Sequence, residues 1–546
     1  MTGSSSTAGL GYERRASGEA ARTTLRLAVP AIVVASLLLL PFLNKPFTID
    51  DPLFLREARH ALVDPLHPAD FEQVWNAGDR LKLSQYLLGG TLPAYVLLPV
   101  VALGGREWMA HLYQLLLLSG FLIASVSVAR RLGCDRRQAN TVGLLIASNP
   151  VTLAMAATCM PDVMAIMFGM AGIDRLLLFR EERRWGAGLA SGWLLAAAVL
   201  CRASTAPLLL VAALLLMPAT WKRAAECLWP LGVATVAVVL FLGLNRGPAA
   251  GATVGAAFQA LTSMRNVPRN LVAFLGYQAL TGPLLVYALL ASGRKFAGVV
   301  AALVALGATG SMLAGALGGP AILVLYMVPA ALGICFILAL MGVVGDLRPA
   351  LPLLVWLGAG LVALPYAYMG AKYLLPGVPA AALLIVLHAA RVRQRRYPLT
   401  VALLVAMGWI CGALIVVGDT TLASSQRAAV DQLIAPRIRR GLTVWAGGQW
   451  AFLAYAEEAG AQALANTPPL PGPGETILVS RLDYYGMLLR MPIRLELLNT
   501  QTDRRCGVFV LNRRLGAGFY SNRFGYLPFA IGCGEVNAYD LYRVLP

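Results

Sequence analysis

Two adjacent carboxylates, Asp50 and Asp51, follow the first long apolar run, in the stretch TIDDP. A third, Asp162, follows a later apolar run in the stretch CMPDV. Each fits a helix start, because aspartate caps helices and proline is common at the first helical position. A carboxylate also accepts the proton of an attacking hydroxyl group, and an ionisable group at a lipid boundary is usually placed for function. The three acids are candidate catalytic residues if they share one face of a membrane.

Three further side chains suit an anion at a membrane surface. Arg202 interrupts an apolar stretch in the sequence CRAST, and Lys372 and Tyr373 lie in YMGAKYLLPGVP. Long cationic side chains at such places also serve as lipid anchors, with the charge at the headgroups and the stem in lipid. Arginine and lysine bind phosphate through charge-assisted hydrogen bonds. We expect Lys372, Tyr373 and Arg202 to bind a phosphate group.

The composition indicates a polytopic membrane protein. Of 546 residues, 58% are hydrophobic and 13% are charged, and the mean hydropathy is +0.68. The net charge of +18 arises from short groups of Lys and Arg between apolar runs, where the positive-inside rule expects them. Membrane topology therefore explains the charge, and nucleic acid is not an expected partner. The eight cysteines show no CxxC spacing, which argues against a zinc ribbon or a thioredoxin-like motif.

The basic clusters predict about thirteen transmembrane helices, with the amino end in the cytoplasm. The run 85–104 contains Gly89, Gly90, Pro93 and Pro99. If this run crossed the bilayer, the arginines at 130–137 would lie outside. We therefore expect it to lie in the outer leaflet without crossing. Asp50, Asp51 and Asp162 then all fall at the outer face of the plasma (inner) membrane.

Three parts of the chain follow from this topology. Residues 1–23 are expected to form a disordered cytoplasmic tail, and residues 24–417 a transmembrane domain whose first outer loop, 45–107, carries juxtamembrane helices. Residues 418–546 contain a proline-rich loop, strand-like runs such as TILVS and GVFVLN, and a helical stretch from 449 to 460. They predict a small extracytoplasmic α/β domain. Cys506 and Cys533 lie in it and are able to pair in an oxidising compartment.

Three motifs together resemble a known family. They are IDDPLFLREARHALVDP after the first predicted span, MPD after the third, and GAKYLLPGVPAAALL late in the chain. They are similar to motifs of membrane glycosyltransferases that use polyprenyl-phosphate sugars, the relatives of protein O-mannosyltransferases and aminoarabinose transferases with the GT-C fold. The resemblance covers about residues 24 to 417. It implies a mainly α-helical, GT-C-like membrane fold.

The resemblance also implies roles for individual residues. Asp50 matches the catalytic base, Asp51 its acidic partner, and Asp162 the acid of a later outer loop. The motif implicated in binding the lipid phosphate matches Lys372, Tyr373 and Pro376. Relatives often carry HPP before the second span, whereas this chain has LKLSQYLLGG at 81–90, which leaves the acceptor and metal dependence open.

The sequence therefore predicts an inverting glycosyltransferase that moves a sugar from a polyprenyl-phosphate donor to an extracytoplasmic glycan, lipid or protein. Asp50 is expected to deprotonate the acceptor hydroxyl. Lys372 and Arg202 are expected to stabilise the departing lipid phosphate. Asp51 and Asp162 are expected to orient the acceptor or sugar, or to hold a divalent metal ion; no other cofactor is indicated.

Two alternatives remain open at this point. A transporter places acids and bases near the bilayer midplane, and Asp174 and Arg175 inside a predicted span favour it, although the sequence has no duplicated half. A non-catalytic envelope sensor or assembly subunit needs the outer domain but no carboxylate pair. His60 and His67 share the first outer loop, but two histidines without ligand spacing are expected to be structural.

Overall fold

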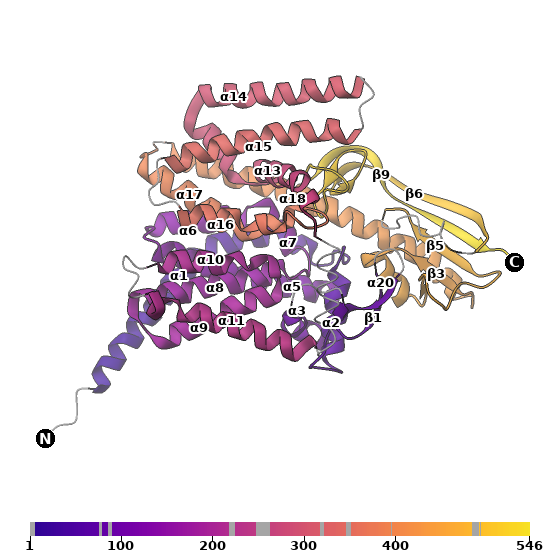
Figure 1. The fold of residues 1–546 in the computed structure, drawn as a ribbon, viewed down its shortest axis with the longest axis horizontal. Helices are drawn as coiled ribbons and strands as arrows, with labels where there is room; N and C mark the ends of the chain where they lie inside the picture. The colour runs from indigo at the N-terminus through magenta and orange to yellow at the C-terminus, as the bar shows by residue number, and fades with distance from the viewer. Residues whose placement is uncertain are drawn as a thin grey trace.

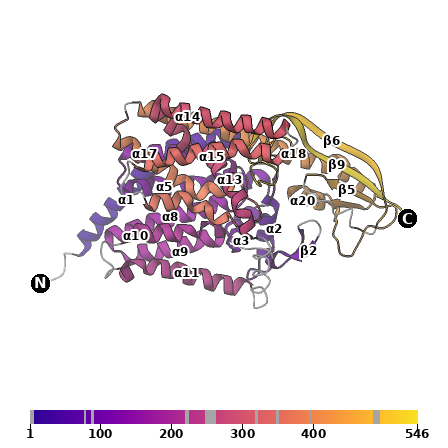
Figure 2. The same ribbon diagram turned by 45° about the horizontal axis from the view of Figure 1, so that its top comes forward.

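A bundle of helices forms most of the molecule, and an α/β domain lies at one end of it (Figure 1). The amino terminus projects from the opposite end (Figures 1 and 2). The computed structural model describes residues 6–75, 79–85, 90–217, 224–246, 262–316, 321–345, 351–394, 396–482, 491 and 493–546.

The helices of the first half are α1 (Ser6–Leu39), α2 (Asp51–Ala61), α3 (Leu92–Val96), α4 (Leu98–Ala102), α5 (Glu107–Arg131), α6 (Arg136–Ala147), α7 (Pro150–Ala156), α8 (Asp162–Glu182), α9 (Trp185–Cys201), α10 (Pro207–Leu216) and α11 (Ala224–Arg246). Those of the second half are α13 (Val267–Thr281), α14 (Pro283–Ala316), α15 (Ala321–Gly345), α16 (Leu351–Leu357), α17 (Val378–Arg391), α18 (Tyr397–Ala429), α19 (Ala435–Ile438) and α20 (Trp450–Glu458). Short 3-10 helices include η1 (Leu40–Phe42), η2 (Leu83–Gln85), η3 (Ala203–Thr205), η5 (Met264–Asn266), η6 (Gly358–Ala363) and η7 (Ala371–Gly377), and a π-helical turn, η8 (Val430–Ile434), follows α18.

Many of these helices have the length and composition of membrane spans. Six described helices meet both criteria, and two bent helix pairs raise the number to eight. Three shorter apolar helices accompany them: Trp185–Cys201, Ala203–Leu216 and Leu351–Ala363. The chain is therefore a mainly α-helical integral membrane protein, as predicted. The number of thirteen spans stays a prediction, because helices such as α8, which carries Asp174 and Arg175, fall outside the six.

The predicted part boundaries differ in detail from the helices. The first helix extends back to Ser6, into the expected tail, although its candidate span begins at Arg22. At the other end, α18 runs without a break past residue 417 to Ala429. The α/β fold begins only with the strand at Val444. The last span therefore extends into the segment that was expected to form the separate domain.

The run 85–104 forms no long helix among its described residues. It contains α3 and α4, of five residues each, and each has a proline in its first turn. A five-residue helix rises only about 7.5 Å, far less than the bilayer core. The absence of a span here agrees with the prediction. The rest of the outer loop contains α2 and an antiparallel pair of strands, β1 (Glu72–Trp75) and β2 (Asp79–Lys82).

The carboxyl-terminal domain is a five-stranded mixed sheet in the order β4-β3-β5-β9-β6. Its central strands β3 (Val444–Gly447) and β5 (Thr476–Ser480) are parallel and fully buried, and α20 connects β3 to β4 (Gln462–Ala463). The two long strands β6 (Leu495–Phe509) and β9 (Ala530–Val544) are antiparallel, and a Cys506–Cys533 disulfide joins them. A small hairpin, β7 (Leu511–Asn512) and β8 (Ala517–Gly518), lies between them in the chain.

A buried ion pair joins this domain to the helical bundle. The ammonium of Lys45, just after the first span, pairs with the carboxylate of Asp419 in α18, and their side chains are 0% and 3% exposed. Thr48 Oγ1 donates a hydrogen bond to Asp419 at 3.1 Å, and the Tyr520 hydroxyl donates another at 2.9 Å. One carboxylate therefore holds together the first outer loop, the last span and the carboxyl-terminal domain.

We expect Lys45→Met to destabilise the protein by about 3 to 5 kcal/mol, because it leaves the buried Asp419 carboxylate without its counterion. Thermal unfolding of the detergent-solubilised protein measures the loss. The matched control is Arg543→Met, which breaks an ion pair with Glu496 whose side chains are about half exposed, and which should change the unfolding temperature little. Equal unfolding temperatures for the two variants would contradict the role of the buried pair.

Candidate active site

Asp50 lies at the start of α2 but does not cap that helix. It occupies the N-cap position, yet its side chain makes no capping hydrogen bond. Its carboxylate is instead 3.8 Å from the ammonium of Lys372, measured from Oδ2 to Nζ. The Asp50 side chain is 20% exposed, whereas that of Lys372 is 5% exposed. The helix-cap interpretation therefore does not account for Asp50, whose carboxylate is partly open to solvent.

Burial raises the pKa of Asp50, and the positive charges of Lys372 and Arg202 partly oppose that rise. A raised pKa increases the basicity of the carboxylate. A general base works best when its pKa approaches the operating pH.

Another acid of the site, Asp162, lies in the first turn of α8 and pairs with Arg202. Its Oδ1 atom is 2.9 Å from the Nε atom of Arg202, which follows α9. Its Oδ2 atom is buried and has no hydrogen-bond partner among the described residues. That oxygen is free to accept a hydrogen bond from a bound hydroxyl group.

The two cations share one aromatic ring. The guanidinium of Arg202 lies 5.4 Å from the centre of the Tyr373 ring, and the ammonium of Lys372 lies 6.0 Å from it. The structure therefore brings together five of the six predicted site residues as two acid-base pairs around Tyr373. Two cations beside one aromatic ring suit a group that carries more than one negative oxygen, such as a phosphate.

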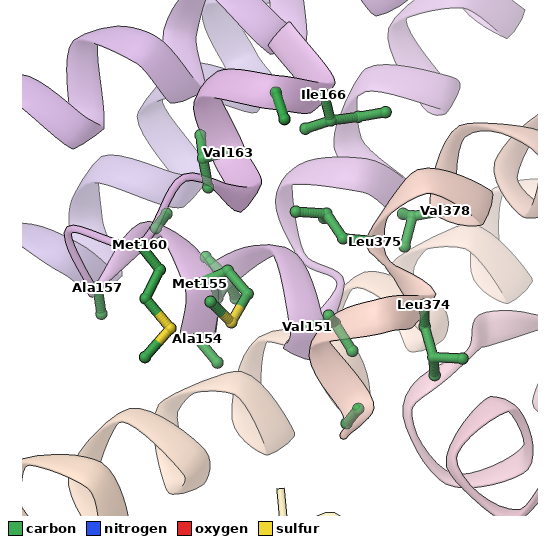
Figure 3. Close-up of a cluster of buried hydrophobic side chains, with 14 of the residues drawn as sticks. Val151, Ala154, Met155, Ala157, Met160, Val163, Ile166, Leu374, Leu375 and Val378 are labelled. Atoms are coloured by element: carbon green, nitrogen blue, oxygen red, sulfur yellow. The ribbon is translucent and has the colours of Figure 1, made fainter. Parts of the chain in front are cut away.

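Tight packing of η7 positions Lys372. Leu374 and Leu375 from η7 and Val378 from α17 pack in one apolar cluster with side chains from α7 and the start of α8 (Figure 3). On the other side of η7, a Cβ atom at Gly370 would lie only 2.6 Å from the carbonyl oxygen of Tyr520. A glycine is therefore required here, because the carboxyl-terminal domain approaches this backbone closely.

The segment before η7 is held by polar side chains of α13. Asn270 donates to the carbonyl groups of Leu364 and Tyr366 at 2.8 and 2.7 Å, and Arg269 donates to that of Ala367 at 2.7 Å. Arg269 therefore helps to hold this segment in place. These bonds place Tyr366 and Tyr368 beside Tyr373, with ring centres of Tyr366 at 4.9 Å from Tyr368 and 6.4 Å from Tyr373.

Asp51 has a different environment from Asp50, although the two are adjacent. It is 0% exposed, and its two oxygens accept hydrogen bonds from the backbone amides of Thr48 at 3.0 Å and Cys159 at 2.7 Å. Burial raises its pKa to about 7. Asp51 therefore fixes the first outer loop to the loop before α8, while Asp50 faces Lys372.

A cleft opens beside Asp50, between the first outer loop and the carboxyl-terminal domain. Its walls come from α2, from β1 and from α20, and they include Asp50, Arg56, Gln73, Trp450 and Glu457. Arg56 and Glu457 form an ion pair across it. The Oε1 atom of Gln73 is buried without a hydrogen-bond partner among the described residues.

Two strained residues line this cleft. Ile49 has φ +44° and Trp450 has φ +58°, in the region that non-glycine residues seldom adopt. Such conformations cluster at binding and catalytic sites, where the surrounding packing maintains them. Their presence on both walls supports a functional role for this cleft.

Other candidate residues have structural contacts elsewhere. His60 packs against Phe71, with ring centres 5.4 Å apart, and His67 Nδ1 lies 3.2 Å from a carboxylate oxygen of Asp64. Both contacts fit the expected structural role.

The acid inside a predicted span is also neutralised. Asp174 pairs with Arg131, at 2.8 Å from its Nε atom, and with its neighbour Arg175. The main feature of the transporter alternative is therefore an internal ion cluster that joins α5 to α8.

Several residues around the site were not singled out from the sequence. Lys45 and Asp419 each had a recognisable signal, a charge at the edge of or inside an apolar run, but nothing in the sequence indicated that they pair. Trp450 lay in a stretch that was read only as a helix. Among the described residues, one group of three potential metal ligands lies close together, with one ligand atom of each within 4.8 Å of the other two, and it comprises Asp51, His111 and Cys159.

Comparisons with known proteins identify the fold. No family model and no curated protein sequence matches the chain. Among solved structures, ArnT from Cupriavidus metallidurans bound to undecaprenyl phosphate is similar, with a TM-score of 0.51 and 14% sequence identity over 86% of this chain and 95% of that one. Its apo state gives a TM-score of 0.45 at 16% identity, with the same coverage of both chains. The mycobacterial arabinofuranosyltransferase AftD gives 0.38 at 15% identity, with 95% of this chain and 41% of that one covered. The first likeness confirms the predicted GT-C fold.

Proposed function

We propose that the protein is an inverting glycosyltransferase that transfers a sugar from a polyprenyl phosphate to a hydroxyl group of an acceptor outside the cytoplasm. The observation that carries the proposal is the pairing of a partly exposed carboxylate, Asp50, with a buried cation, Lys372, beside a second cation, Arg202. An acid that is open to a cleft and next to two cations combines the groups needed to activate a hydroxyl and stabilise a leaving phosphate. The ArnT structure with undecaprenyl phosphate supports a lipid-phosphate donor for this fold.

The reaction proceeds by a single displacement. The Asp50 carboxylate takes the proton of the acceptor hydroxyl as its oxygen attacks the anomeric carbon. The bond from that carbon to the phosphate oxygen breaks, and its electron pair remains on the lipid phosphate. Lys372 and Arg202 stabilise the negative charge that grows there, so the leaving group needs no proton. Asp162, through its free Oδ2 atom, orients a hydroxyl group of the donor sugar.

The acceptor enters through the cleft between α2 and α20. Trp450 contributes an aromatic side chain to its lining, and Gln73, Arg56 and Glu457 contribute hydrogen-bonding groups. This combination of one flat apolar surface with several polar groups suits a sugar ring, so a glycan or glycolipid is the favoured acceptor class. The carboxyl-terminal domain contributes α20 and therefore takes part in selecting the acceptor.

Asp50→Asn tests the proposal directly. A general base contributes roughly 100 to 10,000-fold to the rate, so we expect turnover to fall by that factor. Release of lipid phosphate from a panel of polyprenyl-phosphate sugars, measured with purified protein, reports turnover. Binding of the donor should be largely retained, because the cations are unchanged.

Asp51→Asn, the same substitution at the adjacent residue, is the matched control for that experiment. Asp51 makes only structural contacts, so its substitution should lower the unfolding temperature more than Asp50→Asn does. If folded Asp50→Asn kept full activity and folded Asp51→Asn lost it, the base would be Asp51 and the assignment to Asp50 would be wrong. Full activity of both variants would reject the proposed chemistry.

Lys372→Met removes the charge at the phosphate and keeps the alkyl stem. A charge-assisted hydrogen bond is worth about 1.5 to 3 kcal/mol, so transfer should weaken by roughly 10 to 150-fold. Part of the loss should appear in kcat, because negative charge on the phosphate grows in the transition state. Lys372→Arg keeps the charge and should retain more activity.

The same variant makes a prediction about pH. Asp50 acts as a base only when deprotonated, so activity is lost as the pH falls through its raised pKa. The positive charge of Lys372 lowers the pKa of Asp50, and its removal therefore raises that pKa. The acidic limb of the kcat/KM profile should move to higher pH in Lys372→Met. Kinetics and a pH profile like those of the wild type would show that Lys372 is only a lipid anchor.

Trp450→Ala tests the acceptor cleft. Loss of the aromatic face should raise the KM for the acceptor several-fold and leave the KM for the donor unchanged, because uniform binding energy is removed. Trp450→Phe keeps an aromatic face and serves as the control. An equal rise in both KM values, or none, would place the acceptor elsewhere.

A further inference from the structure

Three potential metal ligands from three separate elements meet behind the candidate active site. Asp51 begins α2, His111 belongs to the first part of α5, and Cys159 lies in the loop before α8. One ligand atom from each lies within 4.8 Å of the other two. His111 is 4% exposed, and the other two are 0% exposed. Such a cluster brings together one nitrogen, one sulfur and one oxygen donor.

The hydrogen bonding of His111 leaves its second ring nitrogen available as a ligand. Its Nδ1 atom lies 2.9 Å from the carbonyl oxygen of Leu43, which can only accept a hydrogen bond. The hydrogen of the neutral ring is therefore on Nδ1, and Nε2 carries an unshared electron pair. Nε2 is buried and has no hydrogen-bond partner among the described residues. This arrangement is the one usually found in metal-binding histidines, whose other nitrogen donates to a carbonyl group or carboxylate.

The other two ligands are also held in place. The backbone amides of Thr48 and Cys159 each bind one oxygen of Asp51, and each of these oxygens keeps a second lone pair. Cys159 is a free cysteine, so its sulfur is available. The nearby ammonium of Lys45 forms its ion pair with Asp419, and its charge also acts on the Asp51 carboxylate.

We propose that Asp51, His111 and Cys159 bind a zinc ion, with a water molecule as the fourth ligand. Mixed nitrogen, sulfur and oxygen donors suit Zn²⁺, whereas Mg²⁺ and Ca²⁺ require oxygen ligands. On binding, the Cys159 thiol releases its proton to solvent, and the two negative ligands balance the charge of the ion. The ion links α2, α5 and the loop before α8, and it thereby positions Asp50, the residue directly before Asp51. This proposal does not depend on the reaction assigned to the site.

The metal content of purified protein tests the site. Because the ligands are buried, the protein is produced in cells grown with added zinc and purified without chelator. Elemental analysis should find about one zinc ion per folded chain. Protein from cells grown with added cobalt should show a thiolate-to-cobalt charge-transfer band, which reports a cysteine ligand in the wild-type protein itself.

Cys159→Ser and His111→Asn should lose the zinc and the cobalt band. Cys335→Ser, which changes another fully buried free cysteine in the distant α15, should keep both. A wild-type protein that carries no more zinc than folded Cys159→Ser, and shows no charge-transfer band with cobalt, would overturn the proposal. Retention of one zinc ion in both ligand variants would place the metal elsewhere and would overturn it equally.

Discussion

The buried pair of Lys45 and Asp419 is the contact on which the arrangement of the candidate active site depends. Removing two charges from water is costly, and the cost is offset only when the charges are paired and their remaining hydrogen-bonding positions are satisfied. Here Thr48 and Tyr520 supply those additional bonds. The bonding partners belong to the first loop, the last span and the carboxyl-terminal domain. The Asp419 carboxylate therefore has all of its partners only when these three parts are packed together. The position of Asp50, five residues after Lys45, depends on this junction.

The carboxyl-terminal domain is accordingly part of the site. Its segment around Tyr520 packs on Gly370 and accepts a hydrogen bond from the amide of Ala371 through the Phe519 carbonyl group at 2.7 Å. The side chain of Asn522 donates a hydrogen bond to Asn270 and accepts one from the backbone amide of Met369. These bonds hold the segment that precedes Gly370. The domain therefore holds the backbone just before Lys372, and its helix α20 forms one wall of the cleft. The candidate active site is therefore built from both the helical bundle and the carboxyl-terminal domain.

Sequence patterns predicted the membrane class and the interrupted run at 85–104, and they singled out the charged residues of the candidate site, because these features depend on local composition and on charge at helix ends. They placed α20 and β5 within a few residues of the observed bounds. The stretch GVFVLN was expected to be one strand, but it is divided between the end of β6 and β7. The long β9 strand gave little signal, because its two glycines and its polar residues are not typical of a buried strand.

The sequence predicted only part of the candidate site, because local patterns do not show which residues contact one another. Residue types and span ends indicated that Asp50, Asp162, Arg202 and Lys372 share one face. The pairing of each acid with one cation depends on how distant helices pack, which periodicity does not encode. The contacts of Lys45 with Asp419 and of His111 with Leu43 span 374 and 68 residues of chain, respectively. Contacts of that separation are determined by tertiary structure alone.

The two adjacent aspartates differ in side-chain orientation and exposure because their surroundings differ. At a helix start, consecutive side chains point in different directions, so one of two acids can turn inward while its neighbour turns toward the cleft. Asp51 turns inward and meets backbone amides, which fix its orientation and leave it no solvent. Asp50 turns toward Lys372 and keeps partial exposure, so a substrate hydroxyl can reach it. The inner acid therefore determines where the outer one lies, and neither residue could take the other's place without a change in the direction of the chain.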